Sequence, residues 1–427
     1  MVADNASAND TQREALAQMD NSFEEENHVR CFNHTLQLTA KTLIRPFNLA
    51  LGKIAEDGGP GDQDDLLDME EEDDEEGEEE DDLPDVPDID DIDDNFDELD
   101  DMDADLREEL IADTAIVRAM VSKLRQLSFL IVRSTTIALP AWRRYCKEFG
   151  LKRRILPRDV VTRWNSTYYM LSFAIKYRAA IDAMTADKSL KLRKFELDEE
   201  EWLIVEDLVS ILLQYKNATI FFSQDLASVA AVIPAMDRLN DSLNQRTGKA
   251  YHPSIVMAMK LAQKKMDRYY SLTDSSNVYR IAMVLHPGMK LEYFHNQRWQ
   301  EEWIEEASSL VREEYHAKYE KETNTVEPVR EKSTTGFLSF GDLSVATRPR
   351  ESEIQAYLNL PVEAVKDPLL WWMNHKHVYP NLHRMALDYL SIPGTYSSLH
   401  IINTHTVLSN FNSCRTSFLT RPSSSPV

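Results

Sequence analysis

The feature that most constrains this chain is a long run of acidic residues. Between Glu56 and Asp105 there are 30 Asp and Glu residues and no Lys or Arg. Mutual repulsion and a sparse apolar content cannot offset the entropy lost when such a segment orders. We therefore expect residues 49–105 to be a disordered acidic insert. It is either a solvated spacer or a surface for basic partners such as histones.

The rest of the chain has the opposite charge. The full 427 residues carry a net charge of −26, so the chain outside the acidic run carries −26 + 30 = +4. A mildly basic body does not repel a phosphate backbone, although so small a charge does not by itself indicate DNA binding. With 43% hydrophobic residues, the chain is long enough for two or three domains.

Cysteine content and the apolar runs bear on the compartment. Cys31, Cys146 and Cys414 are too few and too scattered for a disulfide framework, which favours a reducing compartment. The first residues lack the basic and apolar regions of a signal peptide, and no stretch approaches the ~18 apolar residues of a membrane span. We expect an intracellular protein.

Helical periodicity begins again at Leu106. Apolar residues recur on one helical face at Leu110, Val117, Val121, Leu124 and Leu127. Three later stretches repeat the pattern: Trp202, Val205, Val209 and Leu212; Ile255, Met259, Ala262, Met266 and Tyr269; Trp299, Trp303, Leu310 and Val311. We therefore predict mostly helices between 106 and 320. Residues 322–350 have neither period and are predicted to be a linker. Beyond them, Asp367 and Pro368 predict a helix start.

Four blocks of the sequence resemble hAT-family DNA transposases, and they stand in the family's order. The first two are ADNASANDTQREALAQM with VRCFNHTLQLTAK, and LPRDVVTRWNSTYYMLSFAIKYRAAI. The last two are FFSQDLASVAAVIPAMDRL with YRIAMVLHPGMKLEYF, and DPLLWWMNHKHVYPNLHRMALDYLSIPGT.

The resemblance implies an α+β fold, in which an RNase H-like domain is interrupted by a large, mostly α-helical insertion and by the acidic loop. Residues 1–48 would be a partial RNase H-like segment, and 106–321 the insertion with its return to the core. Residues 351–395 would be a truncated C-terminal dimerisation region and 396–427 a divergent tail. Loss of the resemblance just after Thr395 predicts a retained intron or a change of reading frame there.

An RNase H-like active site uses three acids to hold two Mg²⁺ or Mn²⁺ ions. The resemblance puts Asp4 at the second acid and places the first upstream of residue 1. The third is a Glu soon after Ile-Pro-x-Thr, whereas this sequence has no Glu after Asp388. We therefore expect an inactive remnant that needs no cofactor, in which Asp4 serves as a turn residue. The alternative is a fragment of an active transposase.

Cys31 and His34 form a Cys-x-x-His pair. A structural zinc site needs about four ligands, and no second pair lies nearby in the sequence. We expect both side chains to pack in the core. The resemblance also implies a BED zinc finger before residue 1, which would supply most of the DNA specificity.

Candidate DNA-binding residues come from the second block. The resemblance puts Arg163 and Trp164 near the cleaved DNA end, where an indole can stack on a base and an Arg can bind phosphate. The alternative is an ordinary core Trp. A basic run just before them favours DNA contact, unless the acidic loop covers it or it is only a solvated face: Arg143, Arg144, Lys147, Lys152, Arg153, Arg154 and Arg158.

The fourth block supplies candidate dimer contacts. Its apolar set comprises Trp371, Trp372, Tyr379, Leu382, Met385, Ala386, Tyr389 and Leu390. Exposed aromatic residues at helical spacing are typical interface anchors, although they could pack only on their own domain. The sequence therefore predicts a nuclear, transposon-derived protein that binds DNA and self-associates without cleaving DNA. A competing hypothesis is an acidic nuclear protein that binds histones.

Overall fold

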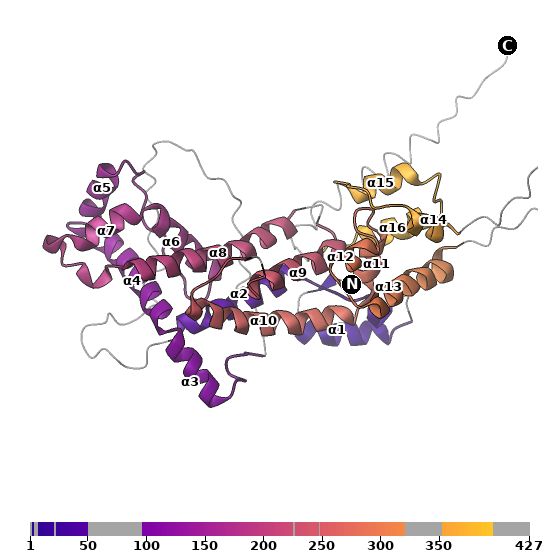
Figure 1. Cartoon of the computed structure of the whole chain (residues 1–427), viewed down its shortest axis with the longest axis horizontal. Coiled ribbons are helices and arrows are strands. Elements are labelled where there is room, and N and C mark those ends of the chain that lie inside the picture. The colour runs from indigo at the N-terminus through magenta and orange to yellow at the C-terminus, as the bar shows by residue number, and fades with distance from the viewer. Residues whose placement is uncertain are drawn as a thin grey trace, which may run out of the picture. The chain divides into compact units, whose positions relative to one another are not determined.

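A computed structural model describes residues 2–3, 7–20, 23–49, 96–224, 227–246, 248–320 and 352–395. The chain divides into two compact units. Unit 1 comprises Met1–His34, Phe222–Ala235 and Tyr270–Val427, and unit 2 comprises Thr35–Phe221 and Met236–Tyr269. Four helices contribute residues to both units: α2 (Phe32–Asn48), α8 (Glu199–Phe222), α9 (Val232–Leu243) and α10 (Pro253–Asp274). Figure 1 labels the elements along the chain.

The two strands of the described residues both lie in unit 1. Strand β1 (Val2–Ala3) pairs in parallel with β2 (Val29–Arg30), with Val2 opposite Val29. Helix α1 (Ser7–Ala17) and the 3₁₀ turn η1 (Glu25–Asn27) connect them, as parallel pairing requires a crossover. The described chain is thus mostly helical, and a complete RNase H-like sheet stays a prediction.

The helices of unit 1 come mainly from the second half of the chain. Besides β1, β2, α1, η1 and its share of the four long helices, unit 1 contains η5 (Val229–Ala231), α11 (Asn277–Leu285), α12 (Glu292–Asn296), α13 (Glu301–Glu314), the π-helical turn η6 (Tyr315–Tyr319), α14 (Glu353–Asn359), α15 (Pro368–His375) and α16 (Leu382–Leu390). Helix α11 contacts α13, α16 and the turn η5, and it is buried along nearly its whole length.

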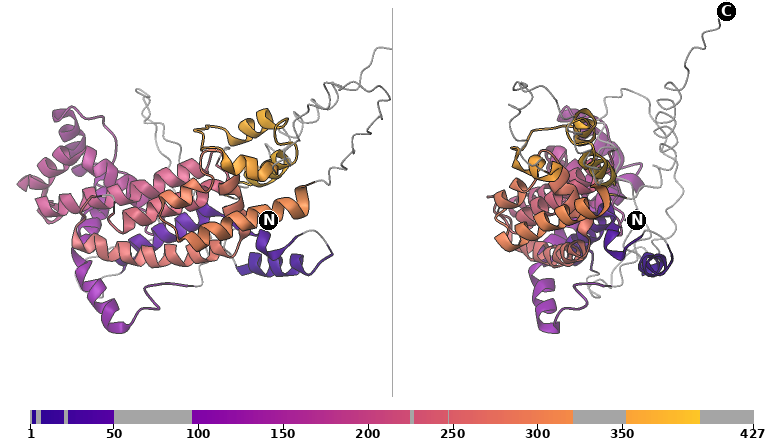
Figure 2. Two further views of the ribbon diagram at one scale, coloured as in Figure 1. Left: turned by 45° about the vertical axis from the view of Figure 1, so that its right-hand side comes forward. Right: turned by 90° about the vertical axis from the view of Figure 1, so that its right-hand side faces the viewer.

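Unit 2 is entirely helical in its described part. Besides its share of the four long helices, it contains α3 (Ala104–Asp113), α4 (Ala115–Arg133), α5 (Ala138–Glu148), α6 (Trp164–Lys176), α7 (Arg178–Ala186) and the 3₁₀ turns η3 (Lys188–Leu190) and η4 (Arg193–Phe195). Helix α5 contacts α4 and α7, and α6 also contacts both. These helices lie side by side in Figure 1 and in the left view of Figure 2.

Most of the predicted helical faces are buried. Leu110, Val117, Val121, Leu124 and Leu127 are all in the core, as are the five apolar positions between Ile255 and Tyr269. Of the face predicted from Trp299, Trp303, Leu310 and Val311, Val311 is buried, but the Trp303 side chain is 50% exposed, so its placement was wrong. Helix α13 buries Ile304 and Ala307 together with Val311, and these three residues form a regular stripe.

The acidic insert ends earlier than the sequence predicts. Residues 50–95 lie outside the described residues, but 96–103 belong to unit 2 and α3 begins at Ala104. Leu99 is buried with Leu110 and Leu261. The Glu98 carboxylate pairs with the buried Lys265 ammonium at 2.8 Å. The expected boundary at 105 is therefore corrected to about 95, because a few apolar residues and one buried cation suffice to order the end of the run.

The predicted start of α15 is confirmed. The Asp367 side chain accepts a hydrogen bond from the Leu370 backbone N–H at 2.9 Å, and Pro368 occupies the first turn. A carboxylate satisfies an amide that has no partner within the helix, and proline fits where no donor is needed.

Candidate nucleic-acid interface and dimerisation region

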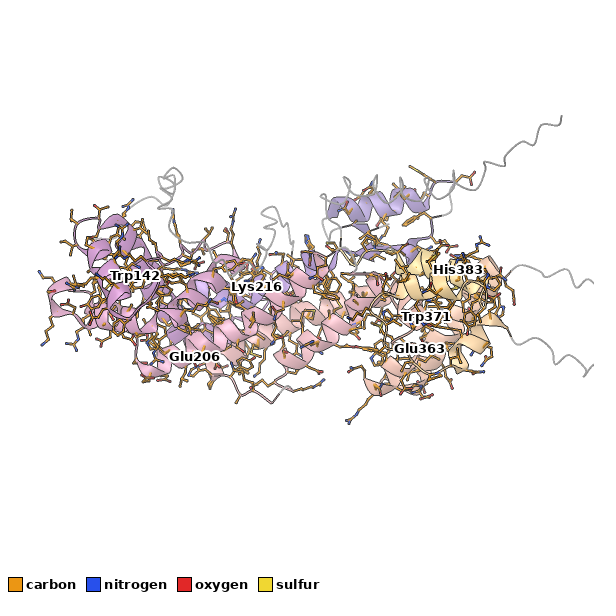
Figure 3. All side chains as sticks on the ribbon, turned by 90° about the horizontal axis from the view of Figure 1, so that it is seen from above. Trp142, Glu206, Lys216, Glu363, Trp371 and His383 are labelled. Carbon is orange, nitrogen blue, oxygen red and sulfur yellow. The ribbon has the colours of Figure 1, made fainter. Side chains whose placement is uncertain are left out.

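Helix α5 presents a basic face to solvent. Its buried residues, Ala138, Ala141, Trp142 and Cys146, form one stripe toward the core of unit 2. Burial raises the pKa of the Cys146 thiol to about 11, so that it stays protonated at neutral pH. The opposite face carries three exposed cations: Arg143, Arg144 and Lys147. Figure 3 labels Trp142, which lies on the buried side of α5.

The segment after α5 is held to the core through its backbone. The Trp142 indole N–H donates to the Arg154 carbonyl at 2.8 Å, and the Tyr177 hydroxyl donates to the Lys152 carbonyl at 2.9 Å. With these carbonyls bound to core side chains, the side chains of Lys152, Arg153 and Arg154 are exposed. The fold therefore fixes the backbone of a cationic segment and leaves its charges at the surface.

Few acids neutralise these cations. Arg144 lies 3.4 Å from the Asp187 carboxylate. Within the described ranges, no ion pair is formed by Arg143, Lys147, Arg153 or Arg154. We call the exposed cations of α5 and of residues 152–158 the α5 surface. Such a surface favours a polyanionic ligand.

Trp164 lies inside unit 2. Its side chain is 1% exposed, its indole N–H donates to the Gln37 side-chain oxygen at 2.7 Å, and its ring packs edge-on against Tyr215. The indole therefore has no open face on which a base could stack. Trp164 is a core residue, which was the alternative interpretation of the sequence. The neighbouring Arg163 is partly exposed, just before the first turn of α6.

The sequence around Trp164 forms a network that the motif alone did not reveal. The buried Asp159 carboxylate pairs with Arg125 and accepts hydrogen bonds from the hydroxyls of Ser166 at 2.7 Å and Thr167 at 2.9 Å. The Ser166 hydroxyl also contacts the Arg163 carbonyl. Asp159, Ser166 and Thr167 thus hold the start of α6. Hydroxyl residues two and three positions after a tryptophan gave the only sequence signal for this arrangement.

The Cys-x-x-His pair is buried in unit 1. Cys31 is 1% exposed, and its thiol lies 3.2 Å from the Thr395 hydroxyl, while His34 is buried one turn further along α2. In the described part of the chain, no three His, Cys, Asp or Glu residues gather as a metal site would require. Asp4 lies outside the described residues, so its predicted place as an ancestral metal ligand stays a prediction.

The aromatic residues of the predicted dimerisation region mostly point into unit 1. Trp372 is fully buried and donates its indole N–H to the Leu285 carbonyl at 2.9 Å. Tyr357 packs against the rings of Trp371, Trp372 and Tyr379. The remaining predicted contacts are also buried: Leu382, Met385 and Tyr389. These residues form the core of the region and are not free to touch a partner.

Trp371 and the apolar residues around it are more accessible. The Trp371 indole N–H donates to the Glu363 carboxylate at 2.8 Å, and its ring stacks on His375 at 3.7 Å (Figure 3). Leu370 and Met373, which share a face of α15, are exposed. Val378, in the turn after α15, is 61% exposed. The sequence prediction did not include Leu370, Met373 or Val378.

Lys290 fixes α14 to the turn that follows α11. Its ammonium donates to the carbonyls of Tyr357 at 2.8 Å and Leu360 at 2.9 Å, and lies over the Tyr357 ring. Burial lowers the pKa of Lys290 to about 8. A cation at the C-terminal end of a helix satisfies carbonyls that have no partner within it. The dimerisation region and α11 are therefore one packed body within unit 1.

Two family matches cover parts of this fold. Residues 96–211 match the ZBED1 RNase-like helical domain, and residues 353–414 match the hAT family C-terminal dimerisation region. The first match begins at Phe96, where the described residues resume after the gap that follows residue 49. The second runs beyond Thr395, where the sequence analysis placed the end of the resemblance.

The chain is also similar to several longer proteins. The fungal protein tpeD of Talaromyces stipitatus, named for transcriptional regulation, is 30% identical over 57% of this chain and 28% of its own length. The zinc finger BED domain-containing protein DAYSLEEPER of Arabidopsis thaliana is 26% identical over 56% of this chain and 36% of its own. A Zea mays protein named for AC transposase is 22% identical over 65% of this chain and 37% of its own length. The chain thus spans about a third of these relatives.

The two matched regions, a helical domain and a C-terminal dimerisation region, identify a class of similar proteins, the hAT transposase-like proteins. Within that class it is similar to the ZBED type of relative. Among the helices that the structure describes, none is long and apolar enough to span a membrane.

Proposed function

We propose that this protein works in the nucleus as a transposon-derived DNA-binding protein that self-associates and does not cleave DNA. The observation that carries the proposal is the α5 surface, whose backbone is fixed by core hydrogen bonds while its cations stay exposed. Its relatives support a nuclear, DNA-related role through their names, which include transcriptional regulation, BED zinc fingers and transposase.

The mode of binding follows from the chemistry of this surface. Arg and Lys neutralise phosphates and release condensed counterions, an interaction that does not depend on base sequence. Because Trp164 is buried, base stacking by that ring is not part of the proposal. We propose that Lys152, Arg153, Arg154 and Arg163 contact the sugar–phosphate backbone, and that any sequence specificity comes from elsewhere.

A salt titration tests this proposal. We expect the protein to bind a fluorescent DNA duplex of arbitrary sequence, with an affinity that falls steeply between 50 and 200 mM salt. Arg153→Glu combined with Arg154→Glu should weaken binding by at least tenfold at low salt, since two phosphate contacts become repulsive. Lys260→Glu with Lys264→Glu is the matched control, because both lysines are exposed on α10. Equal affinity of all three proteins would refute the α5 surface.

Self-association is proposed through the dimerisation region. Trp372, Tyr379, Leu382, Met385 and Tyr389 would support the interface from beneath, because they are buried in their own unit. The contacts themselves would come from Leu370, Met373 and Val378, with Trp371 at the edge. Exposed apolar residues next to a well-packed aromatic core are typical of interface surfaces.

The absence of cleavage rests on the sequence. The position at which the family resemblance places the third metal-binding acid follows Thr395, and the sequence has neither Asp nor Glu after Asp388. A site for two Mg²⁺ or Mn²⁺ ions needs several carboxylates, so the lack of an acid at the third position argues against cleavage. The alternative hypothesis of histone binding by the acidic run has no support from the relatives.

A further inference from the structure

A second group of cations lies beside the α5 surface and belongs to no motif that the sequence analysis singled out. The segment 188–194 reads KSLKLRK, and four of its seven residues are basic. All four are exposed: Lys188, Lys191, Arg193 and Lys194. Leu192 and Phe195 are buried and anchor the segment in unit 2, so that buried apolar positions alternate with exposed cations.

One carboxylate joins this segment to α5. The Asp187 side chain accepts hydrogen bonds from the Ser189 backbone N–H at 2.9 Å and from the Tyr145 hydroxyl at 2.9 Å. It also lies 3.4 Å from the Arg144 guanidinium. Asp187 therefore caps the turn η3 and fixes it to the basic helix. Since this acid is engaged by several donors, it contributes little free negative charge to the surface around it.

The backbone of the segment is held in an uncommon conformation. Lys191 has φ 55° and ψ 32°, in the left-handed region, at the end of η3. A residue with a β-carbon adopts this conformation at a cost, which the surrounding structure must offset. Here the burial of Leu192 and Phe195 and the Asp187 cap provide that support. The result is a tight turn in which a lysine stands where glycine or asparagine would be easier to accommodate.

The charges of the segment are only partly neutralised. Arg193 pairs with Glu196 at 3.2 Å, and Lys194 lies over the Phe195 ring. No such contact is made by Lys188 or Lys191 to any residue of the described ranges. Together with the α5 surface, the segment surrounds Asp187 with cations drawn from two separate parts of the sequence. A cationic surface of this kind fits a ligand that carries many regularly spaced negative charges.

We infer that Lys188, Lys191, Arg193 and Lys194 bind the phosphate backbone of duplex DNA together with the α5 surface. The inference rests on the proposed function and enlarges its contact surface. Duplex DNA is favoured over a single strand because Trp142, Trp164 and Phe195 are buried, whereas single-strand binding uses a series of exposed rings. Near this surface Phe149 is exposed, but one ring cannot stack successive bases.

Salt-dependent binding of the full chain to a fluorescent 25-base-pair duplex tests the inference. Lys188→Gln with Lys191→Gln should weaken binding about tenfold or more at 50 mM salt. It should also reduce the slope of log affinity against log salt by about 1.8, which corresponds to two lost phosphate contacts. Lys191→Gly is a second variant, because glycine removes the charge and accepts the left-handed backbone. Lys260→Gln with Lys264→Gln should leave both quantities unchanged.

The outcomes separate the inference from the proposed function. If Arg153→Glu with Arg154→Glu abolishes binding while Lys188→Gln with Lys191→Gln leaves affinity and slope unchanged, the inference fails and the α5 surface stands. If the unaltered protein does not bind duplex DNA, both fail. Tighter binding to a single-stranded oligonucleotide of equal length would overturn the choice of duplex. Circular dichroism of every variant should match that of the unaltered protein, and Lys191→Gly replaces any glutamine variant that does not fold.

Discussion

At the scale of single residues, burial decides what a motif can do. Trp164 belongs to the segment that most resembles a transposase, yet its ring is enclosed and its N–H is bound to Gln37. Its neighbours Asp159, Ser166 and Thr167 are tied together by hydrogen bonds around the start of α6. In this structure the motif orders a helix start, and Arg153 and Arg154, in the segment before it, have exposed side chains.

Substitutions at Trp164 should therefore affect stability more than binding. We expect Trp164→Ala to lower the free energy of unfolding by ~3–5 kcal/mol, because a large buried side chain is replaced by a cavity. Trp164→Phe should cost less, roughly 1–3 kcal/mol, mainly by leaving the Gln37 oxygen without its donor. Urea unfolding measures both. A Phe variant with unchanged stability but at least tenfold weaker duplex binding would show that the ring meets DNA after all.

At the scale of elements, a few residues at the end of the acidic run determine where the folded structure resumes. Phe96, Glu98 and Leu99 lie in an acidic stretch, yet they pack on α10 residues of unit 2. Lys265 is a buried cation, and the Glu98 carboxylate lies 2.8 Å from its ammonium. A buried charge is tolerated only when it is paired and hydrogen-bonded.

Two deletions should separate the acidic insert from the folded unit. Removal of residues 56–94 should leave the melting temperature nearly unchanged, because the packed residues are kept. Removal of 56–105 should destabilise unit 2 by several kcal/mol. It removes the Glu98 carboxylate from the buried Lys265 charge, and it removes Leu99, which covers Leu261. The single substitution Glu98→Gln tests the ion pair alone and should lower the free energy of unfolding by ~3–5 kcal/mol. Equal thermal stability of both deletions would contradict this boundary.

The exposed face of α15 makes a separate prediction about association. Leu370→Glu combined with Val378→Glu should shift any dimer toward monomer in sedimentation velocity, because it places charges in an apolar contact. Met19→Glu serves as the control, since that side chain is also exposed but lies outside the dimerisation region. The fold should survive both changes. Undiminished self-association of the double variant would move the interface to another surface.

At the scale of the whole molecule, the chain combines a helical domain with a hAT-type dimerisation region, and the sequence has neither Asp nor Glu after Asp388. We expect no cleavage of supercoiled or linear DNA in 5–10 mM Mg²⁺ or Mn²⁺, as two-metal chemistry needs several carboxylates. Gel analysis of the products is the measurement. Metal-dependent cleavage that disappears with Asp4→Ala, but not with the matched change Asp20→Ala, would restore the active-transposase alternative.

The sequence by itself determined the helical character, the class of relatives and the position of the α15 cap, because periodicity and capping depend on residues close together in the chain. It could not decide whether Trp164 and Trp372 face solvent, that α13 buries Ile304 instead of Trp303, or that Lys265 pairs with Glu98. Each of these depends on partners far away in the sequence. The cationic surface built from α5 and residues 188–194 is of the same kind, since contacts of Asp187 join its two halves.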